Sequence, residues 1–417
     1  MGMTRSFDVM LNEYLAIDML KETLVKRDFM LSRATIDKNH KGGNIPVPFK
    51  ASSASSIKFG GLTDESDISE DDYVRGAIPA QKEVSGTMVF HERDIAEHGS
   101  KGVNEQSFLK NLLMTSEDFV ENMRQAISIN LLNGSHFAKL TSDATANDGN
   151  IVVDHPERFT IGQKVIVDDD DTAAITGYVK SININTYTVN LVTARGGSTV
   201  FDFSGANMEV VQNAKCYMDG AQTTYFTSLR SQLLSATAGG DATLFGQTKT
   251  LYPYLQALNF SAAGVITATN ILEKLFDYYN TTRKIGKGNP TEVIMSYKHL
   301  GSIMKIIEAH KGAYKMADGV KASLYGWTSL EIVGPKGQLV ITGVNEMDDD
   351  VIYMMDWKDN VKFFTNNFFD FHFDPNGSKY FTIRSTTGYK YLIDLILRGE
   401  FAVTRPSHCA AVYGISY

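Results

Sequence analysis

The chain has 417 residues, which corresponds to two or three domains at about 150 residues per domain. Hydrophobic residues make up 43% and charged residues 21% of it, values that exclude an intrinsically disordered protein and predict a substantial core. The net charge of −8 argues against a protein that wraps nucleic acid, because neutralising phosphates needs an excess of Lys and Arg.

The cysteine content and the N-terminal residues limit the cellular compartments that are expected for the protein. The two cysteines, Cys216 and Cys409, lie far apart, which excludes a disulfide scaffold and a Cys-based zinc site and favours a reducing cytoplasm. Residues 1–20 carry acidic side chains within their apolar stretch, so they lack a signal-peptide core. No window approaches the roughly 18 uninterrupted apolar residues of a membrane helix, and we expect neither secretion nor a membrane span.

The N-terminal region is predicted to contain a helix followed by an extended segment. From Phe7 to Lys26, apolar residues recur near helical spacing with charged residues between them, which indicates an amphipathic helix. The segment Ile45–Phe49 is expected to be extended, because Pro46 and Pro48 disfavour a helix and cannot donate to a sheet ladder.

Residues 51–85 form a long polar stretch rich in Ser, Gly and Asp, with too few apolar residues for a core of their own. One reading is disorder. The other is an extended hairpin that packs on another subunit, with Ile45–Phe49 and Gly86–Phe90 as its two arms. We favour the hairpin.

A long helix is predicted from Asn104 to Asn133, with one apolar stripe and an Asn-Gly stop signal at its end. At 1.5 Å per residue it would span about 40 Å and could act as a strut. Further on, residues 151–212 show short alternating runs, such as Phe159–Val167 and Tyr187–Leu191, separated by a tight turn at 184–187. This pattern predicts an inserted antiparallel β-domain, either a barrel or a sandwich.

The segment from 262 to 365 is predicted to mix helices and strands. Asn270 and Glu273 resemble a capping box that opens a helix over Ile271–Ile285, and Ser296 is expected to open a second helix that ends at Gly312. The strands expected around them are Glu292–Ser296, Leu330–Val333, Gln338–Thr342 and Val351–Trp357, and Tyr380–Val403 reads as almost continuous strand.

A search for chemistry along the chain assigns no catalytic, cofactor-binding or metal-binding residue. His91–His98 lacks the second His, four residues after the first, that a metalloprotease helix requires. Asp168–Asp171 and Asp348–Asp350 lack EF-hand spacing and are expected to be solvated acidic turns, and Gly286–Pro290 is expected to be a helix stop. The basic residues between 283 and 321 indicate either a solvated surface or a weak face toward a polyanion.

The order of these parts is more informative than any single motif. An N-terminal arm, the sequence GGNIPVP, a polar hairpin closing with AIPAQKEVSGTMVFHERDI, the helix SEDFVENMRQAISINLLNG, a mixed region and a strand-rich end follow one another. This layout resembles the major capsid protein of tailed bacteriophages, the Hong Kong ninety-seven-like shell fold, which is an α+β fold. The resemblance spans essentially the whole chain.

The resemblance implies a division of the chain into seven parts. They are an N-terminal arm (1–44), an extended E-loop hairpin (45–100), a peripheral domain with its spine helix (101–150), an inserted β-barrel-like domain (151–212), a connection through the peripheral domain (213–261), an axial domain (262–365) and a return into the peripheral domain (366–417).

The resemblance also implies a non-catalytic protein that self-assembles into homopentamers and homohexamers of an icosahedral head around a DNA genome. Its partners would be copies of itself, a separate scaffolding protein, portal and decoration proteins, and packaged double-stranded DNA in non-specific proximity, without a membrane. It would reside in the virion after assembly in the bacterial cytoplasm. Some relatives cross-link a lysine of this hairpin, but nothing around Lys50, Lys58 or Lys82 specifies that chemistry.

Two alternatives remain open on the sequence. An encapsulin-like nanocompartment of the same fold would package a cargo protein in place of DNA. A multidomain soluble enzyme or carbohydrate-binding protein would have a site assembled from residues distant in sequence.

Overall fold

The structure is a computed structural model, and its chain divides into two compact units. We call Asn133–Phe226 the inserted unit, and Met1–Leu132 together with Thr227–Tyr417 the main unit. The structure describes residues 17–38, 43–50, 73–91, 103–145, 147–168, 174–204, 210–222, 225–286, 288–309, 329–334, 337–358, 360–366, 368–371, 381–385 and 388–416.

Two short helices open the described part of the main unit. Helix α2 (Ile17–Arg27) and helix α3 (Phe29–Arg33) are separated by Asp28, whose side chain caps α3 by accepting the Leu31 N–H. Their apolar side chains Leu24, Met30 and Leu31 are buried. The predicted N-terminal helix is confirmed from residue 17 onward, and residues 7–16 lie outside the described residues.

A sheet built on one long strand forms the centre of the main unit. Strand β21 (Gly388–Val403) pairs along one edge with β4 (Lys82–His91). Its other edge pairs in turn with β18 (Val361–Phe364), β19 (Phe369–Phe371) and β20 (Phe381–Ser385), and β1 (Thr35–Asp37) adds to β18. The predicted strand-rich end is confirmed. At 3.3 Å per residue, β21 alone spans roughly 50 Å.

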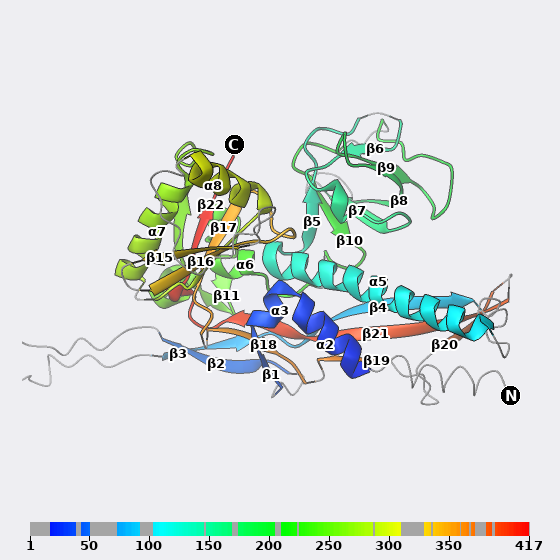
Figure 1. Ribbon diagram of the computed structural model, residues 1–417, viewed down its shortest axis with the longest axis horizontal. Coiled ribbons are helices and arrows are strands. Elements are labelled where there is room, and N and C mark those ends of the chain that lie inside the picture. The colour runs from blue at the N-terminus through cyan, green and yellow to red at the C-terminus, as the bar shows by residue number, and fades with distance from the viewer. Residues whose placement is uncertain are drawn as a thin grey trace, which may run out of the picture. The chain divides into compact units, whose positions relative to one another are not determined.

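Helix α5 (Val103–Asn133) packs on this sheet. Its apolar stripe is buried at Val120, Met123, Ile127 and Leu131, and the Phe119 ring lies against Gly86 of β4, where a Cβ atom would be 2.4 Å from the ring. Figure 1 shows α5 running along β4 and β21. The predicted long helix is confirmed to within one residue at its start.

A two-stranded ribbon forms from β2 (Ile45–Lys50) and β3 (Tyr73–Ile78), with Ile45 opposite Ile78 and Lys50 opposite Tyr73. The predicted hairpin therefore has its first arm where expected, but its second arm was wrong. Gly86–Phe90 lies in β4, which pairs over its whole length with β21 and has no contact with β2 in the ladder. Of the polar stretch 51–85, residues 51–72 lie outside the described residues.

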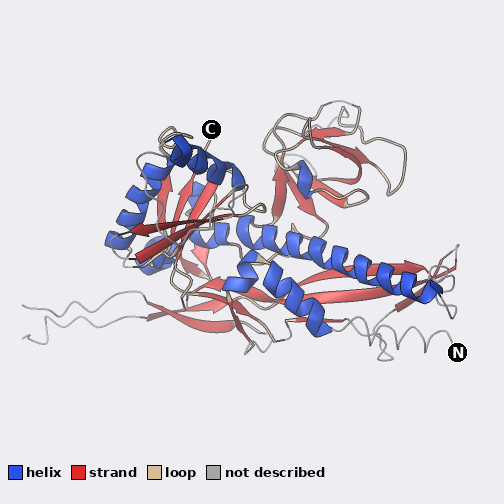
Figure 2. Ribbon diagram, viewed as in Figure 1, coloured by secondary structure: helices blue, strands red, loops and turns tan. Residues whose placement is uncertain are grey.

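A second sheet with two helices forms the mixed region. Its strand order is β13 (Leu258–Ser261), β22 (Ala410–Tyr413), β17 (Val351–Met355), β14 (Glu292–Met295), β16 (Gly337–Gly343) and β15 (Ser329–Gly334). Helices α7 (Ile271–Ile285) and α8 (Tyr297–Ala309) pack against it around Leu275, Ile303 and Ile341 (Figure 2). The predicted elements of this region are confirmed, and Gly312 lies outside the described residues.

Ser296 opens α8 as predicted, since its carbonyl accepts the Leu300 N–H at 3.1 Å, but the predicted capping box at Asn270 is not formed. The Asn270 side chain does not cap α7, because its oxygen accepts the Thr267 N–H and its amide donates to the Val265 carbonyl. The Ser296 hydroxyl is buried and has no hydrogen-bond partner. Both helices are held instead by burial of one apolar face.

Short elements connect the two sheets. They are α6 (Leu229–Leu233), the 3₁₀ turns η3 (Ala236–Ala238), η4 (Lys249–Leu251), η5 (Pro253–Leu255) and η6 (Pro406–His408), and the hairpin β11 (Thr243–Leu244) and β12 (Gln247–Thr248). The loop of that hairpin, at Phe245, packs under the β2–β3 ribbon.

The inserted unit is a six-stranded antiparallel sheet that closes on itself. Its order is β5 (His136–Lys139), β10 (Lys215–Met218), β7 (Lys164–Asp168), β8 (Ile175–Asn183), β9 (Thr188–Val192) and β6 (Asn150–Val152), with a 3₁₀ turn η2 (Pro156–Arg158). A bridge between Leu140 and Val153 joins the two ends, so the sheet is a small barrel. The predicted turn at 184–187 is confirmed.

The limits of this unit are wider than the predicted range 151–212. Strands β5 and β10 belong to the same sheet, and Tyr217 pairs with His136. The chain therefore enters and leaves the unit through neighbouring antiparallel strands.

Candidate functional site

The β2–β3 ribbon is anchored to the main unit at its base. Ile45, Val47 and Ile78 share one face in the register and pack against a cluster that includes Phe245 and Leu255. The Ala77 N–H donates to the Phe245 carbonyl at 3.0 Å, and the Gln247 side chain donates to the Arg75 carbonyl at 2.8 Å. The core and these bonds hold one end of the ribbon, and residues 51–72 continue the chain from the other end.

Neither edge of the ribbon base is suited to pairing with another strand. Because the Ala77 N–H points to Phe245, the Pro46–Ala77 pair is a non-hydrogen-bonded pair, and Pro46 and Pro48 direct their nitrogens to the free edge of β2. Proline has no N–H, so this edge lacks two donors. The β3 edge is occupied by Phe245 and Gln247. The base of the ribbon is therefore poorly suited to accept a further strand at either edge.

The β4–β21 sheet presents a polar ladder on the face opposite α5. Thr87 donates to Asp394 at 2.6 Å, and Arg398 donates to Glu83 at 2.9 Å across the two strands. The Arg398 and Glu83 side chains are 41% and 47% exposed. One face of the sheet thus carries the core under α5, while the other is a polar surface.

A buried carboxylate ties the N-terminal segment to the mixed region. Glu292 of β14 accepts two hydrogen bonds from the Arg33 guanidinium, at 2.6 and 2.8 Å, and further ones from Thr342 at 2.6 Å and Trp357 at 2.7 Å. The Arg33 guanidinium also lies over the Phe29 ring, 3.9 Å from its centre. Four donors around one carboxylate make this a rigid joint.

A second joint links α5 to the loop after β16. The Arg124 guanidinium donates to Glu346 at 2.7 Å and to Glu121 at 2.9 Å, and these carboxylates raise its pKa against the effect of burial. Asp28 lies close by and is fully buried. Burial raises the pKa of the Asp28 carboxyl to about 7, and the nearby Glu346 charge adds to this effect while Arg124 opposes it.

The acidic run Asp348–Asp350 forms a third joint and corrects the expectation of a solvated turn. Arg230 donates to both oxygens of Asp350, at 2.9 and 2.7 Å, and approaches Asp348 within 3.6 Å. The Asp348 side chain is only 7% exposed. These carboxylates therefore bind Arg230, which is distant in sequence, and hold two segments together. Burial lowers the pKa of Arg230, but the carboxylates raise it by more. Of the other acidic run, Asp168 ends β7 and accepts from Gln222, and residues 169–171 lie outside the described residues.

Two of the three lysines considered in the hairpin region, Lys50 and Lys82, lie in described strands. Lys82 begins β4 and lies 3.4 Å from Glu400, which is fully buried and also accepts the Thr227 N–H. Burial raises the pKa of the Glu400 carboxyl, and Lys82 opposes this. Lys50 ends β2, and Lys58 lies outside the described residues. Lys82 is therefore paired within its own chain.

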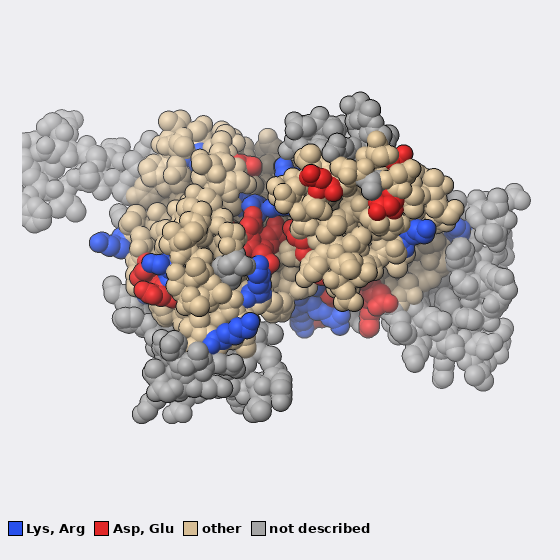
Figure 3. All heavy atoms as spheres, turned by 90° about the horizontal axis from the view of Figure 1, so that it is seen from above, with Lys and Arg blue, Asp and Glu red and all other residues tan. Residues whose placement is uncertain are grey.

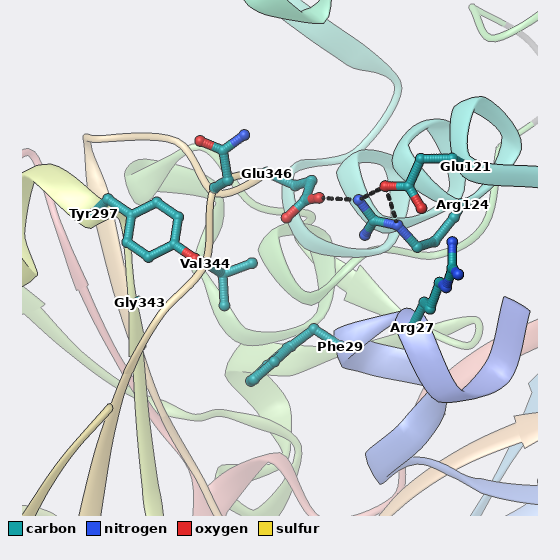
Figure 4. A pocket seen from close by; sticks show the side chains of 9 residues that line it. Arg27, Phe29, Glu121, Arg124, Tyr297, Gly343, Val344 and Glu346 are labelled. Atoms are coloured by element: carbon teal, nitrogen blue, oxygen red, sulfur yellow. Dashed lines mark hydrogen bonds and ion pairs between the residues drawn. The ribbon is translucent and has the colours of Figure 1, made fainter. Parts of the chain in front are cut away.

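A cavity of about 490 Å³ opens where α2, α5, α8 and the loop after β16 meet (Figure 4). Figure 4 shows the Arg124 guanidinium between the Glu121 and Glu346 carboxylates. Tyr297 lies across the cavity from them (Figure 4). None of the described residues that line it is a serine, cysteine or histidine. Its lining residues are Arg27, Phe29, Glu121, Arg124, Tyr297, Gly343, Val344, Asn345 and Glu346.

Some of the candidate metal-binding residues considered in the sequence, and both cysteines, lie in the described part of the chain. No group of His, Cys, Asp and Glu there could hold a metal ion, and of His91–His98 only His91 is described. Cys216 and Cys409 are buried and form no disulfide, and burial raises the pKa of Cys409 to about 12. Within the same residues, no helix is long and apolar enough to cross a membrane.

The expectation for the basic residues between 283 and 321 concerns residues of which only a part is described. On the face in Figure 3, described Lys and Arg side chains are interspersed with Asp and Glu in small groups. The described part of 283–321 holds the end of α7 and all of α8, and residues 310–321 lie outside it. Gly286 ends α7 as expected, with its N–H donating to Thr282.

Comparison with known proteins finds similarity in structure and none in sequence. No protein-family model and no curated protein sequence matches the chain. Among solved structures, it is similar to the capsid of a native GTA particle, at 11% identity and a TM-score of 0.46, covering 93% of this chain and 90% of that chain. The cyanophage A-1(L) capsid matches at 10% identity and a TM-score of 0.45, covering 94% and 93%.

A cellular shell protein is among the similar structures too. The SrpI encapsulin of Synechococcus elongatus matches at 7% identity and a TM-score of 0.39, covering 94% of this chain and 89% of that chain.

Proposed function

We propose that this chain is the major capsid protein of a tailed bacteriophage, a non-catalytic subunit that assembles into homopentamers and homohexamers of an icosahedral DNA-filled head. The observation that carries the proposal is the β2–β3 ribbon. Among the described residues its base is anchored by the Phe245 cluster, and the chain continues from its other end into residues 51–72, which hold too few apolar residues for a core of their own. A segment without a core of its own would gain stability by packing on a neighbouring copy, and this is the role that we propose for it.

The main unit supports the same proposal. Helix α5 and strand β21 together form a panel roughly 50 Å long, which is stiffened by a packed face on one side and carries a polar ladder on the other. An elongated panel of this kind suits a subunit that forms part of a shell. The partners we propose are other copies, a separate scaffolding protein, and portal and decoration proteins, with DNA in non-specific proximity inside.

Replacing residues 50–73 by Asn-Gly tests the proposal. Phe49 and Val74 face each other as a hydrogen-bonded pair in the register, so a two-residue turn closes the ribbon without disturbing its base. We expect the variant to fold with an unchanged thermal unfolding midpoint and to lose shell formation when it is co-expressed with its scaffolding protein. Electron microscopy and light scattering measure the assembly.

A matched control replaces residues 51–72 with a Gly/Ser segment of equal length. This segment removes the six acidic side chains and the one lysine of the natural loop, a net charge of −5 out of −8 for the chain. We expect it to fold and also to fail in assembly. Shells formed by the Asn-Gly variant would contradict the proposal, and shells from the wild type that hold a protein cargo and no nucleic acid would indicate a nanocompartment.

A further inference from the structure

The joint between α2 and α3 contains a carboxyl group whose ionised form is destabilised by its surroundings. Asp28 is fully buried; its Oδ1 accepts the Leu31 N–H at 2.7 Å, and its Oδ2 has no partner at normal hydrogen-bond geometry. The Leu31 and Met30 N–H groups both favour the ionised form, but burial outweighs them. A buried carboxylate oxygen without a donor is costly when ionised and much less so when protonated. Asp28 therefore stabilises the joint in its neutral form.

The charged groups that face Asp28 do not compensate for an ionised form. From α5, Arg124 is the nearest cation, but it is already shared between Glu121 and Glu346. From the loop after β16, Glu346 repels a charge on Asp28. On the same segment, Arg33 is committed to Glu292, while Arg27 is exposed and directed to the cavity together with Tyr297 of α8.

The space into which the joint can open is already present. Arg27 and Phe29, on either side of Asp28, both line the cavity of about 490 Å³, which is large enough to hold several water molecules. A change at the single turn 27–29 would bring the Asp28 carboxylate into contact with that water. The buried apolar residues Leu24, Met30 and Leu31 oppose this opening.

We propose that Asp28 is a proton-controlled latch: the protonated side chain holds the α2–α3 joint closed against α5 and the loop after β16, and loss of the proton opens the joint into the adjoining cavity. The latch belongs to the main unit alone. It does not rest on shell assembly, since it can be measured in an unassembled subunit.

The direction of the pH dependence follows from the carboxyl group. The pKa of Asp28 is raised to about 7 in the closed joint, whereas an open, solvated aspartate has a pKa of about 3.9. The closed joint thus binds a proton that the open joint has released. Its extra stability is fully present below pH of about 4, declines as the pH rises, and is lost above about 7.

Hydrogen–deuterium exchange of residues 17–33 in the full chain, corrected for the intrinsic exchange rate, tests the latch. The opening constant of the wild type should rise by about tenfold per pH unit between pH 5 and 7 and then level off. Asp28→Asn keeps the capping oxygen and carries no charge, so its opening constant should not change with pH. Glu22→Gln on α2, which removes an exposed carboxylate, should behave like the wild type.

A second variant keeps the test decisive. Glu346→Gln removes the repelling charge and frees Arg124, so the levelling of the opening constant should shift to lower pH. A wild-type opening constant that is independent of pH, or the same slope in Asp28→Asn, would overturn the latch. If Asp28→Asn does not fold, an unchanged levelling point in Glu346→Gln overturns it instead.

Discussion

At the scale of single residues, close approaches of the backbone decide where side chains can be tolerated. Gly399 of β21 is an example, because a Cβ atom there would lie 2.1 Å from the Phe363 ring and 2.9 Å from the Phe364 carbonyl oxygen. The ring could turn, but the carbonyl belongs to the neighbouring strand β18 and cannot move without breaking the ladder. Gly301 in α8 is the opposite case, since nothing lies within 4 Å of its Cβ position.

Substitutions at these two glycines should therefore have opposite effects. We expect Gly399→Ala to destabilise the protein by about 1–3 kcal/mol through overpacking. Gly301→Ala should stabilise it by about 0.5–1 kcal/mol, because alanine is the better helix former. Urea unfolding followed by circular dichroism measures both. A neutral Gly399→Ala would show that β18 and β21 can separate more easily than their packing indicates.

At the scale of elements, ion pairs between distant segments hold helices and strands together in proportion to their burial. The Glu292 side chain is 7% exposed where it binds Arg33, and that of Glu83 is 47% exposed where it binds Arg398. The two pairs have similar distances, 2.6 and 2.9 Å. Burial distinguishes them, because water screens the exposed pair and removal of one buried partner leaves an unpaired charge.

Neutralising each glutamate tests this difference. We expect Glu292→Gln to cost about 2–4 kcal/mol, since Arg33, Thr342 and Trp357 lose charge-assisted hydrogen bonds together. Glu83→Gln should change the free energy of unfolding by less than about 0.5 kcal/mol. Equal losses in the two variants, measured by chemical denaturation, would contradict the role given to burial.

At the scale of the whole molecule, the inserted unit is expected to be separable from the main unit. Tyr217 pairs with His136, so β5 and β10, the first and last strands of the unit along the chain, lie about 5 Å apart at that pair. A short Gly-Ser linker in place of residues 136–217 should leave the main unit folded. Calorimetry should then show the loss of one unfolding transition, whereas an unfolded product would mean that the main unit depends on the insert.

The sequence predicted the elements whose signals are local. The long helix α5, the helix α7 and the turn between β8 and β9 depend on periodicity and stop signals within a few residues, and all three lie where they were expected. The latch residue Asp28 was missed, although an Asp before a short apolar run is an N-cap signal. Burial raises the pKa of Asp28, and it depends on distant segments that the sequence around residue 28 does not identify.

What the sequence alone determined is the position of the long helix, the helix α7 and the turn between β8 and β9, together with the polar character of residues 51–72. Only the tertiary structure decided that β3, and not β4, is the partner of β2, that Asp348 is buried, and that Arg33 meets Glu292 at a separation of 259 residues. The physical reason is that strand pairing and charge burial depend on which distant segments meet, and a strand carries the same alternating pattern whichever neighbour it takes.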